Sequence, residues 1–380
     1  MSSIRRIDDI EVLRAFAVLF VVLSHLNGSL YRFSTDNLFG RIYASFSGGF
    51  GVDLFFAISG FVIARSMLPK FSGNVTKKEF KNLAFSFWTR RIFRLLPSAW
   101  LWLAIILLLQ INFNQSGAFG SLRANIDATI AAVLQFANVR FALGFGRFEL
   151  GASFVYWSLS LEEQFYLIFP FLALLTRNKL IVVLAVVICL QLFQARGMWL
   201  MMFRTDALCF GILVAMMVHT DVYASLKRAC QASPALFSML LALLLVLMVV
   251  FSSKDFVIKH CDKSIIAILS FIVVLITSFN EDIFRRILPL HKVFLWIGSR
   301  SYAIYLMHVP LFYVVRELYF RFHIAMSDHV VVAVALSFLL IACCAELNFR
   351  LIEDPIRRWG TKLAERKFGR VNHSVSAALT

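Results

Sequence analysis

The apolar positions of the chain fall into long runs separated by short polar segments. A run of about 18 to 20 apolar residues is long enough to cross the hydrocarbon core of a bilayer as an α-helix. Runs near this length recur throughout the chain and predict an all-α, polytopic membrane protein with about ten spanning helices. The predicted spans lie near residues 8–28, 47–68, 96–113, 155–176, 179–196, 203–219, 234–251, 264–280, 296–316 and 329–352.

One apolar segment does not fit this pattern. Residues 127–143, "DATIAAVLQFANVRFAL", are short for a span and are followed by polar residues. We expect them to form an amphipathic or short helix inside a long external loop over 114–154. The chain has no evident internal repeat, and its last residues are short and basic. We therefore expect one membrane unit over 1–358 and a basic cytoplasmic tail over 359–380.

The composition supports a membrane protein. Hydrophobic residues make up 60% of the chain and charged residues 16%, with a mean hydropathy of +0.79. The formal net charge of +16 could suggest nucleic acid, but the basic residues gather in alternate loops, as the positive-inside rule requires. The loops 65–95, 219–230 and 281–292 and the tail then lie in the cytoplasm, with both termini. This distribution indicates membrane topology and excludes a nucleic-acid partner.

The first span resembles a signal peptide because basic residues precede an apolar core. However, Asp8, Asp9, Glu11 and Arg14 lie ahead of that core, and no small-residue cleavage pattern follows. We expect a retained span, with Asp8 or Asp9 as the N-cap of its helix.

The six cysteines have neither metal-ligand nor disulfide spacing, so we interpret them as small hydrophobic residues and expect no metal site.

Ionisable residues inside spans are costly and therefore mark candidate functional sites. Residues 14–25, "RAFAVLFVVLSH", place Arg14 and His25 on nearly the same helix face, about 16 Å apart. With the predicted topology, Arg14 lies toward the cytoplasm and His25 toward the outside. Asp53, Glu162 and His308 also lie in the outer halves of their spans, so candidate acid, base and orienting groups gather in one layer.

Arg91 and Arg94, in "RRIFRLLP", lie at the cytoplasmic end of the third span and share a helix face. Paired guanidinium groups suit a phosphate-bearing ligand. The whole arrangement suits a cytoplasmic donor such as acyl-CoA and an acceptor hydroxyl on the far side of the membrane. His25 would act as general base or carry the acyl group, and a carboxylate would orient it.

Other interpretations fit the same residues. Arg91 and Arg94 also suit charges that set topology, and His25, Ser301 and Tyr302 suit polar contacts between helices. A carrier or flippase for a lipid-linked glycan would use the same charged residues to line a pathway. Such carriers often have discontinuous spans in related halves, and the absence of internal symmetry here favours an enzyme. A membrane sensor is a weaker option, because no signalling domain accompanies the spans.

Seven motifs occur in one order along the chain: "IEVLRAFAVLFVVLSH", "GVDLFFAISGFVI", "RRIFRLLP", "WSLSLEEQFYLIFP", "RTDALCFG", "SYAIYLMHVP" and "EDPIRR". Together they resemble the acyltransferase-3 family of bacterial integral-membrane acyltransferases over residues 8–358. The resemblance implies ten spans with both ends inside, in the bacterial cytoplasmic (inner) membrane.

The resemblance also implies roles for individual residues. His25 would be catalytic, and Arg14, Arg91 and Arg94 would bind the donor. Asp53 and Glu162 would polarise or orient reacting groups. Three further residues would have supporting roles: Ser301, Tyr302 and His308.

The implied reaction is transfer of an acyl group, usually acetyl, to a hydroxyl of a cell-surface polysaccharide, such as O-antigen lipopolysaccharide, or of a lipid-linked glycan. Cytoplasmic acetyl-CoA would be the donor substrate, with no permanently bound cofactor and no metal. The chain resembles the stand-alone form without a fused extracytoplasmic SGNH domain. That form completes the transfer itself or passes the acyl group to a separate extracytoplasmic transferase.

Overall fold

The computed structural model describes residues 7–33, 38–71, 75–175, 179–194, 197–253 and 262–369, and within them the chain is helical and contains no strand. Cys261 and residues 370–380 of the predicted tail lie outside the described residues. The helices of the first half are α1 (Asp8–His25), α2 (Leu38–Ser45), α3 (Phe50–Met67), α4 (Lys77–Asn112), α5 (Leu122–Val133), α6 (Ala137–Gly144), α7 (Tyr156–Leu175) and α8 (Leu180–Leu192). Those of the second half are α9 (Met198–Met202), α10 (Asp206–Met217), α11 (Asp221–Ala232), α12 (Pro234–Ser252), α13 (Asp262–Ser278), α14 (Ile283–Ile287), α15 (His291–Ser299), α16 (Ser301–Arg321), α17 (Val330–Asn348) and α18 (Asp354–Phe368). Four short π or 3-10 segments adjoin them: η1 (Leu26–Leu30), η2 (Leu68–Phe71), η3 (Met326–His329) and η4 (Phe349–Glu353).

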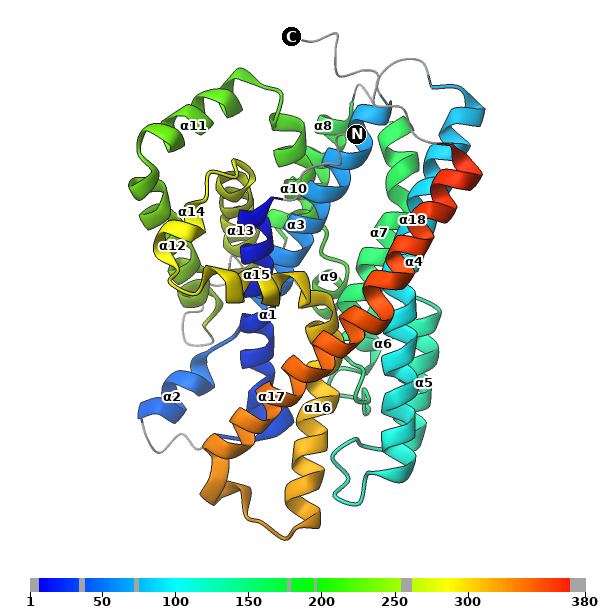
Figure 1. Cartoon of the computed structure of the whole chain (residues 1–380), viewed down its shortest axis with the longest axis vertical. Helices are drawn as coiled ribbons and strands as arrows, with labels where there is room; N and C mark the ends of the chain where they lie inside the picture. Colours follow the sequence, from blue (N-terminus) through cyan, green and yellow to red (C-terminus); the bar gives the residue numbers. More distant parts are fainter. Residues whose placement is uncertain are drawn as a thin grey trace.

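A helix occupies each of the ten predicted ranges (Figure 1). Among the residues that the structure describes, four helical segments can cross a membrane by length and composition: Phe50–Phe71, Lys77–Asn112, Pro234–Ser252 and Met326–Phe368. The pair α10 and α11, bent by 88°, makes a fifth if it is one span. α1 and α16 are not in this set, and both carry several charged residues. The chain is a multi-pass membrane protein, and charged residues lower the hydropathy of α1 and α16.

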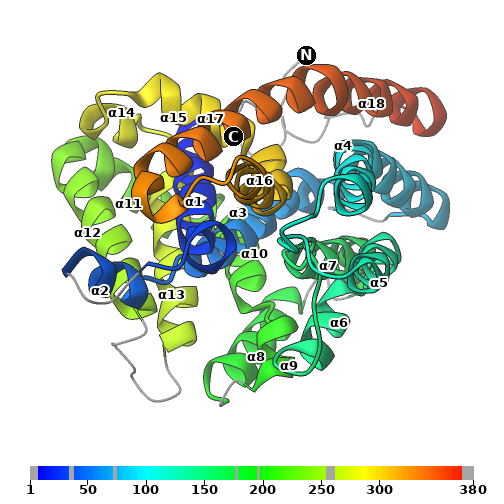
Figure 2. The ribbon, with the colours of Figure 1, turned by 90° about the horizontal axis from the view of Figure 1, so that it is seen from below.

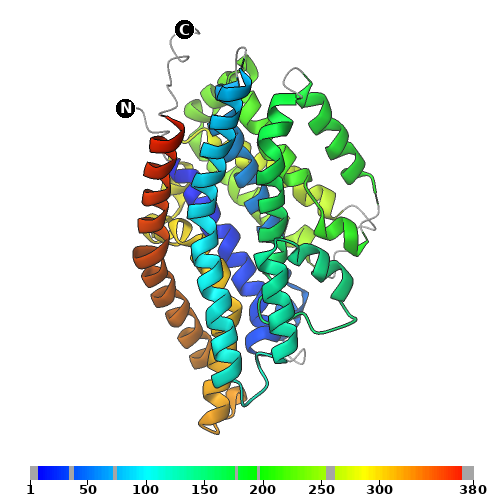
Figure 3. The ribbon, with the colours of Figure 1, turned by 90° about the vertical axis from the view of Figure 1, so that its right-hand side faces the viewer.

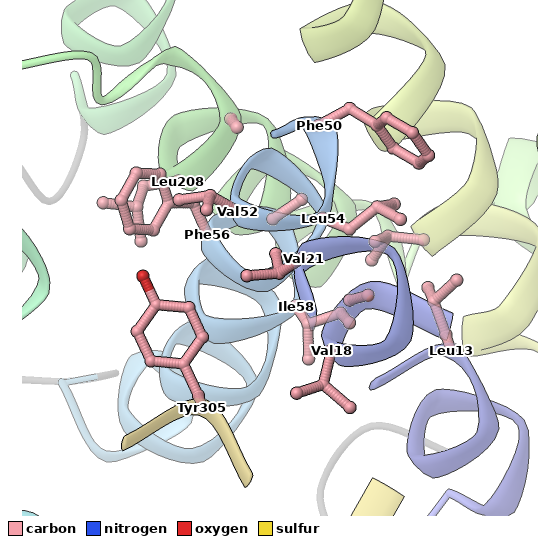
Figure 4. Close-up of a cluster of buried hydrophobic side chains, with 14 of the residues drawn as sticks. Leu13, Val18, Val21, Phe50, Val52, Leu54, Phe56, Ile58, Leu208 and Tyr305 are labelled. Carbon is pink, nitrogen blue, oxygen red and sulfur yellow. The ribbon is translucent and has the colours of Figure 1, made fainter. Parts of the chain in front are cut away.

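Small residues set the closest helix contacts, in the middle of the bundle (Figure 2). A Cβ built at Gly60 of α3 would lie 2.1 Å from the carbonyl oxygen of Leu208, and one at Gly211 of α10 would lie 2.0 Å from that of Ala57. A Cβ at Gly51 would lie 2.3 Å from the carbonyl oxygen of a residue in α1. Glycine lets membrane helices approach backbone to backbone. α1, α3 and α10 therefore form a tight centre whose apolar side chains interlock (Figure 4).

The segment 127–143 forms short helices, as predicted, but there are two. α5 and α6 are separated at Gln135, whose φ is +59°. The side-chain amide of Gln164 on α7 donates to the carbonyl of Gln135 at 2.7 Å and to the side-chain oxygen of Asn138 at 3.0 Å. α7 thereby satisfies polar groups that this break exposes.

A proline inside α7 is compensated in a similar way. Pro170 has no N–H, so the carbonyl of Tyr166 loses its helical donor. The indole N–H of Trp88 on α4 donates to that carbonyl at 3.1 Å. This contact ties α4 to α7 beside the pocket described below.

The predicted N-cap of the first helix is wrong. Ile7 occupies that position and has no capping side chain, and the N–H of Asp8 donates instead to the side-chain oxygen of Asn280 at 3.1 Å. The buried carboxylate of Asp9 instead accepts hydrogen bonds from the backbone N–H groups of Ile283 and Phe284, each at 3.2 Å. These N–H groups open α14 and have no partner within their own helix, so Asp9 caps a helix far along the chain.

The C-terminal helices form one long rod on the side of the bundle. Met326–Phe368 runs from α17 through the π turn η4 into α18, which packs along α4 (Figure 3). The expected boundary at residue 358 falls within α18. Beyond it, Trp359 packs edge-on against Phe93 at 4.8 Å, and Phe368 stacks on Phe85 at 6.0 Å.

Candidate active site

A cavity of about 360 Å³ lies between α1, α3, α4, α7, α15, α16 and the junction of η4 with α18. Its charged lining is mainly arginine: Arg14, Arg65, Arg91, Arg94 and Arg357. Three carboxylates share the cavity, from Glu11, Glu162 and Glu353. The lining therefore has a formal surplus of positive charge. Such a cavity suits an anionic ligand with several phosphate oxygens.

Arg14 is held within the first turns of α1. Its guanidinium Nη1 lies 2.8 Å from the Glu11 carboxylate. α15 packs closely against the same turn at Gly298: a Cβ built there would lie 1.8 Å from the backbone oxygen of Glu11. Only glycine allows this approach, and the contact places the start of α16 beside Arg14.

Arg91 and Arg94 line the cavity from one face of α4, as their spacing predicts. The Arg91 guanidinium lies over the Tyr166 ring, 4.8 Å from its centre, and 5.7 Å from the centre of the Phe87 ring. A cation–π contact uses the face of the guanidinium. Its N–H donors lie around the edge, where they can bind an anion.

Hydroxyl groups and a carboxylate line the cavity beside these arginines. The Glu162 carboxylate accepts hydrogen bonds from Ser59 and Tyr166. Tyr302 donates to the carbonyl of Leu95 at 2.7 Å, and Ser301 lines the cavity beside it. Glu162, Ser301 and Tyr302 thus meet the predicted donor-binding arginines in one place.

His25 and His308 form a pair. His25 is the last residue of α1, and the π turn η1 follows it, with a kink at Asn27 and at Gly28, where φ is +97°. His25 Nδ1 lies 2.9 Å from His308 Nε2. His308 is fully buried, whereas His25 is partly exposed. Only His25 of this pair is therefore open to a substrate.

Tyr305 connects the cavity to the histidine pair. Its side chain lines the cavity and shares a hydrogen bond of 2.7 Å with Ser158, while its backbone carbonyl lies 2.8 Å from His308 Nδ1. Figure 4 shows the Tyr305 ring beside Val52 and Phe56 of α3, which also line the cavity. Neither histidine belongs to the lining among the described residues. Tyr305 thus contacts both the arginine-lined cavity, through its side chain, and the histidine pair, through its backbone carbonyl.

Asp53 lies elsewhere. Its carboxylate forms a buried ion pair with Arg204, with 3.0 Å between Oδ1 and Nε. The Arg204 guanidinium also lies 5.3 Å from the centre of the Trp157 ring. Asp53 is not among the described residues that line the cavity. The contact joins α3 to the turn before α10 and braces the helix that carries one wall of the cavity.

Sequence reasoning assigned several cavity residues to other roles. Arg65 and Arg357 were interpreted as charges that set topology, yet both line the cavity with Glu353. Tyr305 lies in the quoted motif "SYAIYLMHVP" but was not singled out. The signal available in the sequence was the spacing: Tyr305 lies three residues before His308 on the same predicted helix, so the two residues share a face. For metals, the part of the chain that the structure describes holds no group of three or more His, Cys, Asp or Glu side chains that could bind an ion.

Comparison with known proteins gives a consistent result. The acyltransferase-3 family model, described as "Acyltransferase domain", matches residues 7–346. O-acetyltransferase OatA of Staphylococcus aureus is 27% identical over 95% of this chain and 59% of its own length. Peptidoglycan O-acetyltransferase OatA of Listeria monocytogenes is 28% identical over 94% of this chain and 57% of its own length. The chain thus spans less than two thirds of these curated relatives.

No solved structure matches the chain. The family match, in contrast, extends from α1 into α17 and covers the histidine pair and all of the cavity lining except Phe349, Glu353 and Arg357. The protein therefore belongs to the acyltransferase-3 family.

Proposed function

We propose that this acyltransferase moves an acetyl group from cytoplasmic acetyl-CoA to a hydroxyl of a cell-surface polysaccharide or lipid-linked glycan, in the bacterial cytoplasmic membrane. One observation carries the proposal: the Tyr305 side chain lines the arginine-rich cavity, and the backbone carbonyl of the same residue contacts His308 of the His308–His25 pair. The O-acetyltransferase relatives support the reaction class and favour a cell-wall glycan as acceptor.

The cavity suits the two parts of the donor. Coenzyme A carries its phosphates at one end and its thioester at the end of a long, flexible arm. The phosphates bind the arginines, which are better than lysine at bidentate contact with phosphate. The arm passes between the apolar side chains of Val52, Phe55 and Phe56 toward Tyr305. The positive-inside rule places the arginine end on the cytoplasmic side, as a cytoplasmic donor requires.

Transfer then uses the exposed histidine. His25 takes the proton of the acceptor hydroxyl while that oxygen attacks the thioester carbonyl carbon. The new C–O ester bond forms, the C–S bond breaks, and the thiolate of coenzyme A receives the proton from His25. In the covalent variant of this route, His25 attacks the thioester carbonyl first, the C–S bond breaks and the coenzyme A thiolate leaves. The acceptor oxygen then attacks the acyl-histidine, the C–N bond breaks, and the hydroxyl proton passes through the released imidazole to the thiolate.

The test follows labelled acetyl groups in inverted membrane vesicles that contain the protein and glycan precursors of the host. We expect label in the glycan with wild type and none above background with His25→Ala. Arg357→Ala should raise the KM for acetyl-CoA by at least about tenfold, the low end of the loss expected for one charged hydrogen bond worth about 1.5–3 kcal/mol. Arg358→Ala is the matched control, because Arg358 is exposed and outside the cavity lining.

The competing carrier function predicts a different result. A carrier would move lipid-linked glycan across the vesicle membrane without consuming acetyl-CoA. The glycan would then stay unlabelled in vesicles with wild type and in vesicles with His25→Ala. Label that is independent of His25, or absent with well-folded wild type, would contradict the proposed function.

A further inference from the structure

We propose that His308 is a positioning residue that selects the tautomer of His25, so that Nε2 of His25 is the reacting nitrogen. The proposal rests on the proposed acyl transfer for its kinetic test. It assigns the reacting atom, which neither the family match nor the relatives specify.

The backbone carbonyl of Tyr305 determines which nitrogen of His308 is protonated. A backbone carbonyl can only accept hydrogen bonds, and the Tyr305 oxygen lies 2.8 Å from His308 Nδ1. Nδ1 of His308 therefore carries the hydrogen. In a neutral imidazole only one nitrogen is protonated, so His308 Nε2 has a bare lone pair.

That lone pair determines the state of His25. His308 Nε2 lies 2.9 Å from His25 Nδ1, and two bare nitrogens at this distance would repel each other. His25 Nδ1 must therefore carry a hydrogen and donate it to His308. Nε2 of neutral His25 is then unprotonated, and it can accept a proton or attack a carbonyl carbon.

Aromatic rings surround the pair. The His308 ring lies 5.7 Å from that of Tyr305 and edge-on to Phe312 at 6.1 Å. On the other side, Phe154 packs edge-on against His25 at 5.4 Å. His308 is fully buried, so it holds the imidazole that reacts and does not meet the substrate itself.

The same hydrogen bond also serves the protonated state. When Nε2 of His25 takes a proton, Nδ1 still donates to His308 Nε2, now from a cation, and the bond becomes charge-assisted and stronger. His308 thus has the role that a carboxylate has in a catalytic triad. The proton leaves again from Nε2 to the departing thiolate, and His308 keeps its own proton throughout.

Three substitutions separate positioning from simple packing. His308→Gln offers an amide oxygen that can accept from His25 Nδ1, and we expect it to keep kcat within about tenfold of wild type. His308→Lys offers only donors, and His308→Leu offers no polar group. Both should lower kcat by at least about 100-fold, the low end of the contribution of general base catalysis, while the KM for acetyl-CoA changes less than about twofold.

Phe312→Leu is the control for packing, because Phe312 is buried against the same imidazole. It should lower thermal stability but leave kcat within about threefold. Near-normal kcat in His308→Leu, equal losses in His308→Gln and His308→Lys, or a loss in Phe312→Leu as large as in His308→Leu would each overturn the proposal.

A measurement on wild-type protein does not depend on how these variants fold. Nitrogen-15 NMR of histidine-labelled protein in lipid bilayers distinguishes a protonated from a bare ring nitrogen, and His25→Ala identifies the His25 signals. We expect a protonated Nδ1 and a bare Nε2 on His25 in the neutral state. The reverse assignment would overturn the tautomer argument even in an active enzyme, whereas absent wild-type activity with the expected assignment would contradict only the proposed function.

Discussion

Replacing Asp53 by leucine leaves the Arg204 guanidinium without its anion in the interior of the helix bundle. The two groups are 1% and 4% exposed, and 3.0 Å separates Asp53 Oδ1 from Arg204 Nε. The perturbation therefore creates an uncompensated buried charge. Arg204→Met instead leaves the buried Asp53 carboxylate without its cation. The double variant Asp53→Leu/Arg204→Met removes both the carboxylate and the guanidinium.

The expected magnitudes follow from burial. Removing one partner of a buried ion pair costs about 3–5 kcal/mol in the free energy of unfolding, because the remaining charge stays desolvated. Arg204→Met also loses the contact with the Trp157 ring, which adds about 0.5–2 kcal/mol. The double variant removes both charges of this pair and should recover most of the loss. We expect it to lie within about 2 kcal/mol of wild type, the size of the lost ring contact.

The assay is the fraction of monodisperse protein that remains after heating in detergent, followed by acetyl transfer in vesicles. If Asp53 acts only through Arg204, the double variant should regain activity together with stability. Additive losses in the double variant would refute the ion-pair reasoning. A double variant that is stable but at least about 100-fold less active would instead place Asp53 in the chemistry, at the scale of general acid–base catalysis, as the sequence analysis expected.

Two further predictions concern the packing around the cavity. Gly298→Ala should cost about 1–3 kcal/mol of stability and raise the KM for acetyl-CoA, because a Cβ there would lie 1.8 Å from a backbone oxygen of α1. Gly197→Ala is the control in the same thermal and kinetic assays, because a Cβ at that position has no atom within 4 Å. Trp88→Phe should lower the thermal midpoint by leaving the buried Tyr166 carbonyl without a donor, at about 1–3 kcal/mol. Adding Pro170→Ala restores a backbone N–H and should recover that loss, and equal midpoints for the single and double variants would contradict this explanation.

Local sequence pattern was sufficient for part of the site. Arg91 and Arg94 are three residues apart on one helix, so their spacing already placed them on a common face. The cavity confirms that they lie together. The same reasoning placed Arg14 on the face of α1 that leads toward His25. These relations depend only on the 3.6-residue repeat, which no distant part of the chain can change.

Relations between helices were beyond such reasoning. Asp9 was expected to cap its own helix but caps α14, 274 residues away in the chain. Arg65 and Arg357 are indistinguishable by pattern from the many arginines of the cytoplasmic loops, and only packing directs them into the cavity. Polar groups in a low-dielectric interior pair with whichever partner is nearest in space, and sequence separation does not limit that choice.

By itself, the amino-acid sequence determined that this chain is an all-helical membrane protein with ionisable groups inside its helices, because the length of apolar runs and the cost of buried charge are local properties. Only the tertiary structure decided which of those groups meet. It joined His25 to His308 across 283 positions and paired Asp53 with Arg204. The physical reason is that glycine contacts between α1, α3 and α10 set the helix positions, and these positions determine the distances on which hydrogen bonding depends.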